Sequence, residues 1–200
     1  MAAPSQFPAW PKQGLTRVPY WVYQDVGLYR SEIDHVFRGR SWNFLCLDAE
    51  SPAPNTFRLS EVGDMPVAIT RDAEGAIHAF ESCCAHSRAL LCLKPFGEAR
   101  EIACVYHKWT YDLKGNLTGV VFRRGIKSSE GMPPDARPES NAPRQLKIDN
   151  YHGLVFGALA TDLPPVEDYL GEDVAAKVRR VMKGPVKSLG GLHHAAAPAL

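Results

Sequence analysis

The sequence lacks a strong excess of charge of either sign. Its 23 Lys and Arg residues are balanced by 22 Asp and Glu residues, which leaves a formal net charge of +1. This balance gives no reason to expect nucleic acid or an anionic membrane as a partner. The chain also lacks an apolar run of the roughly 18 residues that a membrane span requires. Its first residues, MAAPSQFPAWPKQG, lack the basic and apolar regions of a secretory signal, so we expect a cytoplasmic protein.

Cysteine is scarce and its count is odd. The chain has five cysteines and no secretory signal, which argues against a disulfide framework and favours reduced thiols. Four of the five cysteines and two of the seven histidines fall within residues 82–112. Thiols close to histidines in a reducing compartment more often indicate a metal site.

The chain organisation predicts a mostly β protein with helical ends. We expect an N-terminal arm and helix over residues 1–44, a small antiparallel β domain over 45–160, a helical segment over 161–187 and an irregular tail over 188–200. The N-terminal helix is predicted at residues 31–42, capped by Ser31. Three hairpins are expected around DAEG, KGN and NYHG, and a long surface excursion over residues 123–143. The apolar face of the C-terminal helix is predicted to contain Val174, Val178, Val181 and Met182.

Two cysteine–histidine pairs carry the chemistry. They are Cys84-x-His86 and Cys104-x-x-His107, separated by 17 residues. Each pair is expected on a loop at the end of a strand, so that two thiolates and two imidazoles converge. A [2Fe–2S] cluster with two cysteines on one iron and two histidines on the other fits this order. The alternatives are a structural zinc of the Cys2His2 type, in which cysteines usually precede histidines, and a set of buried thiols with incidental histidines.

The other cysteines are weighed separately. Cys83 adjoins Cys84 and offers a C-x-x-H spacing, but alternate positions of an extended segment face the same way, which favours Cys84 as the partner of His86. Cys92 is expected to be a buried thiol, and Cys46 a core residue of a first strand.

These motifs resemble a known family. The pattern C-x-H…C-x-Y-H-x-W followed by YDLKGNLTGV is similar to the large (α) subunit of Rieske-type aromatic-ring-hydroxylating oxygenases, over residues 20 to about 187. CVYHKWTYDLKGNLTGVVFRRG and GLVFGAL look most like the salicylate 5-hydroxylase branch. The resemblance implies a Rieske domain whose [2Fe–2S] ligands are Cys84, His86, Cys104 and His107.

The resemblance also implies partners. In the family, electrons pass from NAD(P)H through a reductase and a ferredoxin to the Rieske cluster. They then reach a mononuclear Fe(II), typically in a neighbouring α subunit, and a small (β) subunit accompanies the α subunits. We expect the catalytic α+β domain with this iron to be absent here, and His193 and His194 to have no metal role. The chain would then act as the electron-transfer portion of such an enzyme, or as a stand-alone Rieske carrier. A zinc-stabilised β module is the third possibility.

Four neighbours of the ligands attract attention. Trp109 is expected beside the cluster, where it would limit access of water, and Tyr106 is a candidate hydrogen-bond donor to a sulfur. Family members usually have Arg-Gly after the first histidine, but this chain has Ser87 and Arg88. Because glycine permits close backbone approach, we expect the replacement to add bulk to the loop.

Overall fold

The structure is a computed structural model that describes residues 10, 12, 14–121, 123–125, 131–132 and 141–183. The predicted tail over residues 188–200 and most of the predicted excursion over 123–143 lie outside the described residues. Within the described part of the chain, no helix is long and apolar enough to cross a membrane.

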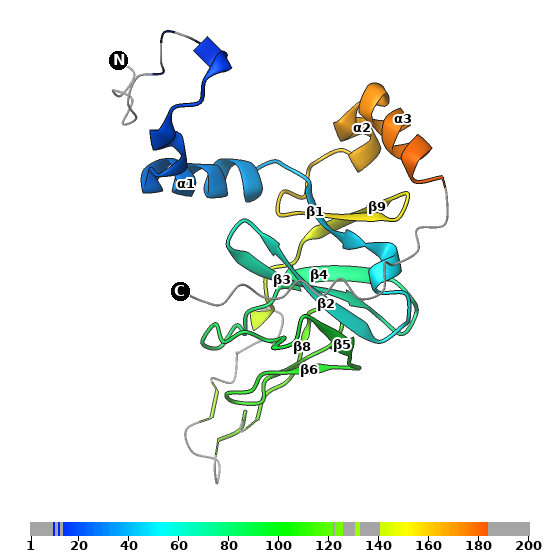
Figure 1. The fold of residues 1–200 in the computed structure, drawn as a ribbon. Helices are drawn as coiled ribbons and strands as arrows, with labels where there is room; N and C mark the ends of the chain where they lie inside the picture. Colours follow the sequence, from blue (N-terminus) through cyan, green and yellow to red (C-terminus); the bar gives the residue numbers. More distant parts are fainter. Residues whose placement is uncertain are drawn as a thin grey trace.

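The described residues form three antiparallel sheets, as the sequence predicted for a mostly β domain (Figure 1). The strand orders are β1-β10-β9, β4-β3-β2-β5 and β6-β7-β8. The strands are β1 (Asn43–Leu47), β2 (Thr56–Val62), β3 (Met65–Arg71), β4 (Ile77–Glu81), β5 (Phe96–Glu98), β6 (Ile102–Ala103), β7 (Thr110–Tyr111), β8 (Leu117–Gly119), β9 (Lys147–Tyr151) and β10 (Leu154–Ala158).

Along the chain, the helices lie before the first strand and after the last one. They are α1 (Val26–Glu32), α2 (Val166–Leu170) and α3 (Glu172–Val181), with a π-helical turn η3 (Ile33–Phe37). Short 3-10 turns are η1 (Gly14–Thr16), η2 (Tyr20–Tyr23) and η4 (Asp48–Glu50). In Figure 1 the sheet β6-β7-β8 lies at the opposite end of the molecule from α2 and α3.

The central hairpin β3–β4 separates two cores. Side chains alternate across a strand, so neighbouring residues of β3 face opposite ways. Ala68 packs with Phe80 in the core shared with the small sheet β6-β7-β8, whereas Val67 and Ile69 pack in a second core with β1 and β10. The predicted hairpins around DAEG, KGN and NYHG are all present.

The N-terminal helix differs from the prediction. It begins at Val26 rather than Ser31, because the Asp25 side chain accepts a hydrogen bond from the Leu28 backbone N–H at 2.7 Å and caps the first turn. Ser31 lies inside the helix, and the helical run ends with the π-helical turn at Phe37. Asp and Ser are equally good caps, so the choice between them depends on packing that the sequence does not reveal.

The predicted face of the C-terminal helix is partly wrong. Val178 is partly buried, but Val174 and Val181 are 45% and 78% exposed. The residue at the centre of the contact is Ala175, which is fully buried and whose carbonyl accepts a hydrogen bond from Tyr151 Oη at 3.2 Å. A small side chain allows the helix to approach the sheet closely, so the buried face is rotated from the line of valines.

The small sheet β6-β7-β8 is held in place by contacts with the four-stranded sheet. The tip of its β7–β8 hairpin meets Phe80 and Gln145: a Cβ at Gly115 would lie 2.7 Å from Phe80 Cδ1 and 2.5 Å from Gln145 Nε2. Thr70 of β3 donates a hydrogen bond to the Leu113 carbonyl. Phe80 and Ala68 also complete the core of the small sheet. The turn at Gly115 therefore requires glycine, both for its left-handed φ of 80° and for this contact.

Candidate metal centre

Two loops of the same length approach one another at the end of the molecule that holds the small sheet. The Cys84 N–H donates to the Ala89 carbonyl and the Arg88 N–H donates to the Cys84 carbonyl, both at 2.8 Å. In the second loop, the Cys104 N–H donates to the Trp109 carbonyl at 2.8 Å, and the Lys108 N–H donates to the Cys104 carbonyl at 3.0 Å. The two loops thus share one backbone frame, although the histidine is two residues after the cysteine in the first and three in the second.

Each frame includes a left-handed residue at the same place. Arg88 has φ 58° and Lys108 has φ 56°. Glycine adopts this conformation without steric cost, so the structure gives a different reason for the Gly that the family usually has at position 88. The added bulk that we expected there is accommodated, because the Arg88 side chain is 70% exposed and points to the Glu81 carboxylate.

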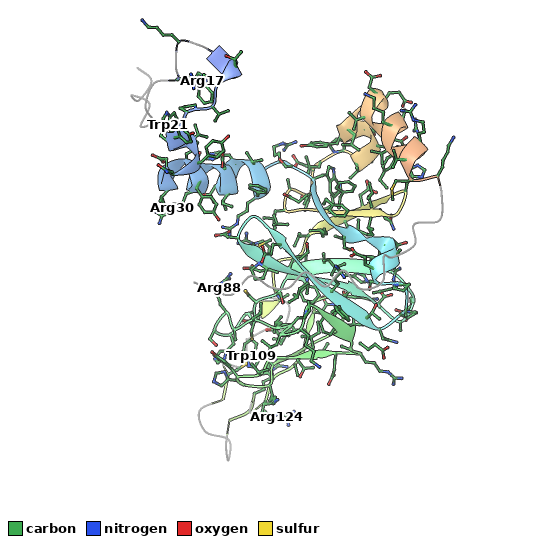
Figure 2. All side chains as sticks on the ribbon, viewed as in Figure 1. Arg17, Trp21, Arg30, Arg88, Trp109 and Arg124 are labelled. Atoms are coloured by element: carbon green, nitrogen blue, oxygen red, sulfur yellow. The ribbon has the colours of Figure 1, made fainter. Side chains whose placement is uncertain are left out.

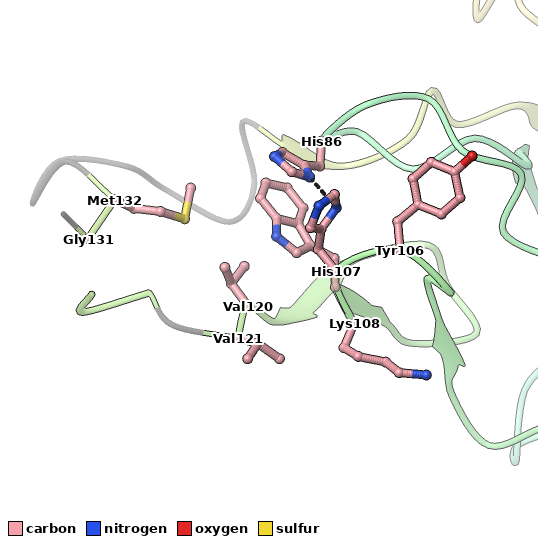
Figure 3. A pocket seen from close by; sticks show the side chains of 9 residues that line it. His86, Tyr106, His107, Lys108, Val120, Val121, Gly131 and Met132 are labelled. Atoms are coloured by element: carbon pink, nitrogen blue, oxygen red, sulfur yellow. Dashed lines mark hydrogen bonds between the residues drawn. The ribbon is translucent and has the colours of Figure 1, made fainter. Parts of the chain in front are cut away.

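The two histidines face one another. His86 Nδ1 and His107 Nδ1 are 3.1 Å apart, and the rings meet edge to face with their centroids 4.5 Å apart (Figure 3). Both side chains are exposed. Two Nδ1 atoms that point at one another can turn their lone pairs toward one shared metal, since neutral imidazole is a metal ligand through its unprotonated nitrogen.

The two predicted cysteine ligands lie on the inner side of the loops. Cys84 and Cys104 are each 1% exposed and belong to the same buried cluster as Trp109 and Tyr111. Cys83 is half-buried and pairs across a β-bridge with Leu90. Cys83 and Cys84 thus differ in burial, and Cys84 is the one that shares a buried cluster with Cys104 of the second loop.

The remaining cysteines are inner thiols. Cys46 is in β1 and Cys92 is in the connection between β4 and β5; both are buried. Burial raises the pKa of each thiol to about 11, which keeps both in the protonated form. Metal ligation uses the thiolate, so these two cysteines match their predicted structural role.

A tyrosine contacts the Cys84 sulfur, but it is not the predicted one. Tyr106 is 67% exposed and lies edge-on to His107 with ring centroids 6.1 Å apart. Tyr111 is fully buried; its Oη is 3.3 Å from Cys84 Sγ and accepts a hydrogen bond from the Ala85 N–H at 3.1 Å. Burial and the Cys84 thiol raise the pKa of Tyr111, so the hydroxyl keeps its proton and can donate a hydrogen bond to the sulfur. The signal for Tyr111 in the sequence is its place in the strand directly after the second loop.

Trp109, which is predicted to lie beside the cluster, stacks on His86. Its ring stacks on His86 with centroids 5.0 Å apart and an interplanar angle of 20°, and it is 7% exposed. Beside it an open groove of about 480 Å³ is lined by both histidines, Trp109, Val120, Val121 and Met132 (Figure 3). The histidine edge therefore borders an apolar surface depression, whereas the cysteines are inside.

The donor set can be tested against the groups it was expected to hold. In the described part of the chain, no three His, Cys, Asp or Glu side chains are grouped closely enough to hold one metal ion. The four residues lie instead as an exposed imidazole pair and a buried thiol pair. A [2Fe–2S] cluster of the mixed type takes two protein ligands at each iron, with sulfides as the others, so paired donors fit it.

Comparison with known proteins agrees with this geometry. Residues 41–129 match the Rieske [2Fe-2S] domain family. The chain is 41% identical over 175 residues to a terephthalate 1,2-dioxygenase terminal oxygenase α subunit from Comamonas sp., 42% over 180 residues to the anthranilate 1,2-dioxygenase large subunit of Burkholderia cepacia, and 37% over 190 residues to the salicylate 5-hydroxylase large oxygenase component of Ralstonia sp.. These matches cover 88%, 90% and 92% of this chain but only 42%, 43% and 45% of the relatives.

Solved structures show the same relationship. A naphthalene 1,2-dioxygenase bound to phenanthrene superimposes with a TM-score of 0.71 at 27% identity, over 79% of this chain and 34% of that one. The chain thus carries a Rieske [2Fe–2S] domain, the type that holds a [2Fe–2S] cluster. It is similar to part of several oxygenase α and large subunits. It spans about two fifths of the length of the relatives that it matches.

Proposed function

We propose that Cys84, His86, Cys104 and His107 hold a [2Fe–2S] cluster, with the cysteines on the inner iron and the histidines on the outer one. The observation that carries this assignment is the pairing itself: two Nδ1 atoms 3.1 Å apart at the surface, and two thiols each 1% exposed behind them. The bound group would supply one-electron transfer. The protein would supply its ligands, its orientation and its separation from water.

The surrounding side chains support that role in separate ways. Trp109 stacks on His86 and limits the orientations of its ring. Tyr111 donates a hydrogen bond to the Cys84 sulfur. This hydrogen bond would favour the reduced state of the cluster, in which the sulfur ligand carries more negative charge. The exposed imidazole edge is the short route for an electron between the site and a partner, because the thiol side is enclosed by the core.

The proposal extends to the partners and the reaction of the longer protein. A ferredoxin and an NAD(P)H-dependent reductase would supply electrons in the cytoplasm. A mononuclear Fe(II) outside the described residues would receive them, in an assembly with other α subunits and a small β subunit. Three of the relatives are named for terephthalate, anthranilate and salicylate, all aromatic carboxylates, so we propose ring hydroxylation of an aromatic acid as the reaction class. The domain limits 1–44, 45–160, 161–187 and 188–200 are part of this proposal.

Metal analysis tests the ligand assignment. The purified chain should contain two irons and two acid-labile sulfides, and its reduced form should give a Rieske-type EPR signal with a low average g. Stoichiometric zinc without sulfide would contradict the proposal in favour of the zinc-stabilised module. Cys84→Ser should abolish the signal, whereas Cys83→Ser, the matched control at the neighbouring position, should retain it.

Turnover tests the functional division. Incubated with NADH, a reductase, a ferredoxin and salicylate, the 200-residue chain should be reduced without forming a hydroxylated product. Gentisate that depends on this chain would contradict the proposed role as the electron-transfer portion, and absence of reduction by the ferredoxin would contradict the proposed partner.

A further inference from the structure

Only one of the two left-handed residues in the ligand loops has an ionic partner among the described residues. Arg88 donates a hydrogen bond from its guanidinium to the Glu81 carboxylate. Lys108, at the matching place in the second loop, has an exposed side chain without an ion pair in the described part of the chain. The two positions share their φ and their hydrogen bond to the preceding cysteine carbonyl, so they differ mainly in this partner.

Glu81 is a fixed anchor. It is the last residue of β4, where it pairs with Val67 of β3, and its N–H donates to the Arg144 carbonyl at 2.8 Å. Its side chain is only 8% exposed. A carboxylate with so little access to water is costly unless a cation pairs with it, so Glu81 and Arg88 each favour the observed position of the other.

Figure 2 shows Arg88 in the same half of the molecule as Trp109 of the second loop. The Arg88 N–H closes the first loop on the Cys84 carbonyl, and the three residues between them include His86. If position 88 left its left-handed conformation, this closing hydrogen bond would be lost. The Cys84 sulfur and the His86 ring would then lose their fixed separation.

We propose that the Glu81–Arg88 ion pair is a positioning device that holds the first ligand loop in its left-handed turn, with Arg88 as the positioning residue. The inference rests on the proposed function, since it takes Cys84 and His86 as ligands. The ion pair offsets the strain that a residue with a Cβ suffers at this φ, a strain that glycine would not have. In the part of the chain that the structure describes, Lys108 of the second loop has no such ion pair.

A matched pair of alanine variants tests the role of the Glu81–Arg88 ion pair. Arg88→Ala and Lys108→Ala each remove one positive charge and one long side chain from a left-handed position, two residues after His86 and one residue after His107. The measurements are the rate at which the visible absorbance of the cluster is lost in the presence of a chelator, the EPR line shape, and hydrogen exchange at the amides of residues 84 and 88. Since the pair is a charge-assisted hydrogen bond, Arg88→Ala should speed cluster loss and both exchange rates by roughly tenfold or more. Its EPR signal should broaden, and Lys108→Ala should change the rates by less than about twofold.

Three further variants separate positioning from a general loss of stability. Arg88→Lys keeps the cation and should retain most of the wild-type lifetime of the cluster. The double variant Glu81→Gln with Arg88→Gly removes both the buried carboxylate and the backbone strain at position 88. Its cluster lifetime should therefore lie closer to the wild-type value than that of Glu81→Gln alone.

The outcomes are distinct. Equal effects of Arg88→Ala and Lys108→Ala would show that the charge alone matters and would overturn the positioning role. If the wild type contains the cluster and the Arg88→Ala variant loses it at the same rate as the wild type, the positioning role is overturned as well. The ligand assignment would remain intact. A wild-type chain without iron and sulfide would overturn the proposed function and the positioning role together.

Discussion

Replacing Tyr111 by Phe should lower the reduction potential of the site. The Tyr111 hydroxyl oxygen already accepts the Ala85 N–H at 3.1 Å, which directs its own proton toward Cys84 Sγ at 3.3 Å. A hydrogen bond to a charged acceptor contributes about 1.5–3 kcal/mol. Only the part that differs between the oxidised and reduced states affects the potential. If that part is on the order of 1 kcal/mol, the one-electron potential should fall by about 40 mV, since 59 mV corresponds to a tenfold change in the equilibrium constant.

The assay is a redox titration followed by EPR, with iron and sulfide measured on the same sample. Phe preserves the buried ring, so the cluster content should match that of the wild type. Tyr106→Phe is the control: this tyrosine is 67% exposed and contacts the ring of His107 rather than a sulfur, so its potential should be unchanged. A potential of Tyr111→Phe equal to or above the wild-type value would refute the donor role, and a shift confined to Tyr106→Phe would reassign it.

Three further outcomes are expected. His107→Cys should lower the potential by on the order of 100 mV, because a thiolate places more negative charge on the cluster than a neutral imidazole does; a redox titration with an unchanged potential would argue against His107 as a ligand. Trp109→Ala should destabilise the fold by about 3 kcal/mol and shorten the lifetime of the cluster in thermal and chelator assays, since it removes a large buried ring that stacks on His86. Asp72→Asn should flatten the acid side of the stability profile measured by thermal unfolding between about pH 5 and 3. The hydrogen bond from His78 lowers the pKa of Asp72, so this pKa is lower in the folded state than in the unfolded state. The Asp72 carboxylate therefore contributes to the free energy of unfolding above its unfolded-state pKa, and this contribution is lost as the pH falls through its folded-state pKa. An acid limb of unchanged slope in the variant would argue against this contribution.

Local signals in the sequence predicted the sheet hairpins well. DAEG and NYHG place glycine where the structure has a left-handed backbone, at Gly75 and Gly153 with φ 87° each. The choice of Cys84 over Cys83 as a ligand stays a prediction; it rests on a local rule too, the alternation of side chains along an extended segment. In these cases the information lies within a few residues, so no knowledge of distant packing was needed.

Features that depend on distant contacts were harder to predict. The C-terminal helix buries Ala175 because Tyr151 of another element approaches it, and nothing within the helix itself marks that contact. Tyr106 and Tyr111 both follow the second cysteine closely, and only the pairing of β7 with β6 and β8 shows which of them turns inward. The short strand β5 pairs with β2 across a separation of about 40 residues, which leaves no periodic signal in three residues.

The docking of the β7–β8 hairpin on the central sheet has a consequence for how this protein can be divided. The strands β6, β7 and β8 are two, two and three residues long, too short to be stable as an isolated sheet. Phe80 fills their core, and Thr70 together with the surface around Gly115 fixes their hairpin tip. The two loops that carry the proposed ligands are therefore not expected to fold apart from the central sheet. A transplant into another scaffold would have to include β3 and β4, and the proposed metal site and the central hairpin should unfold in a single cooperative step.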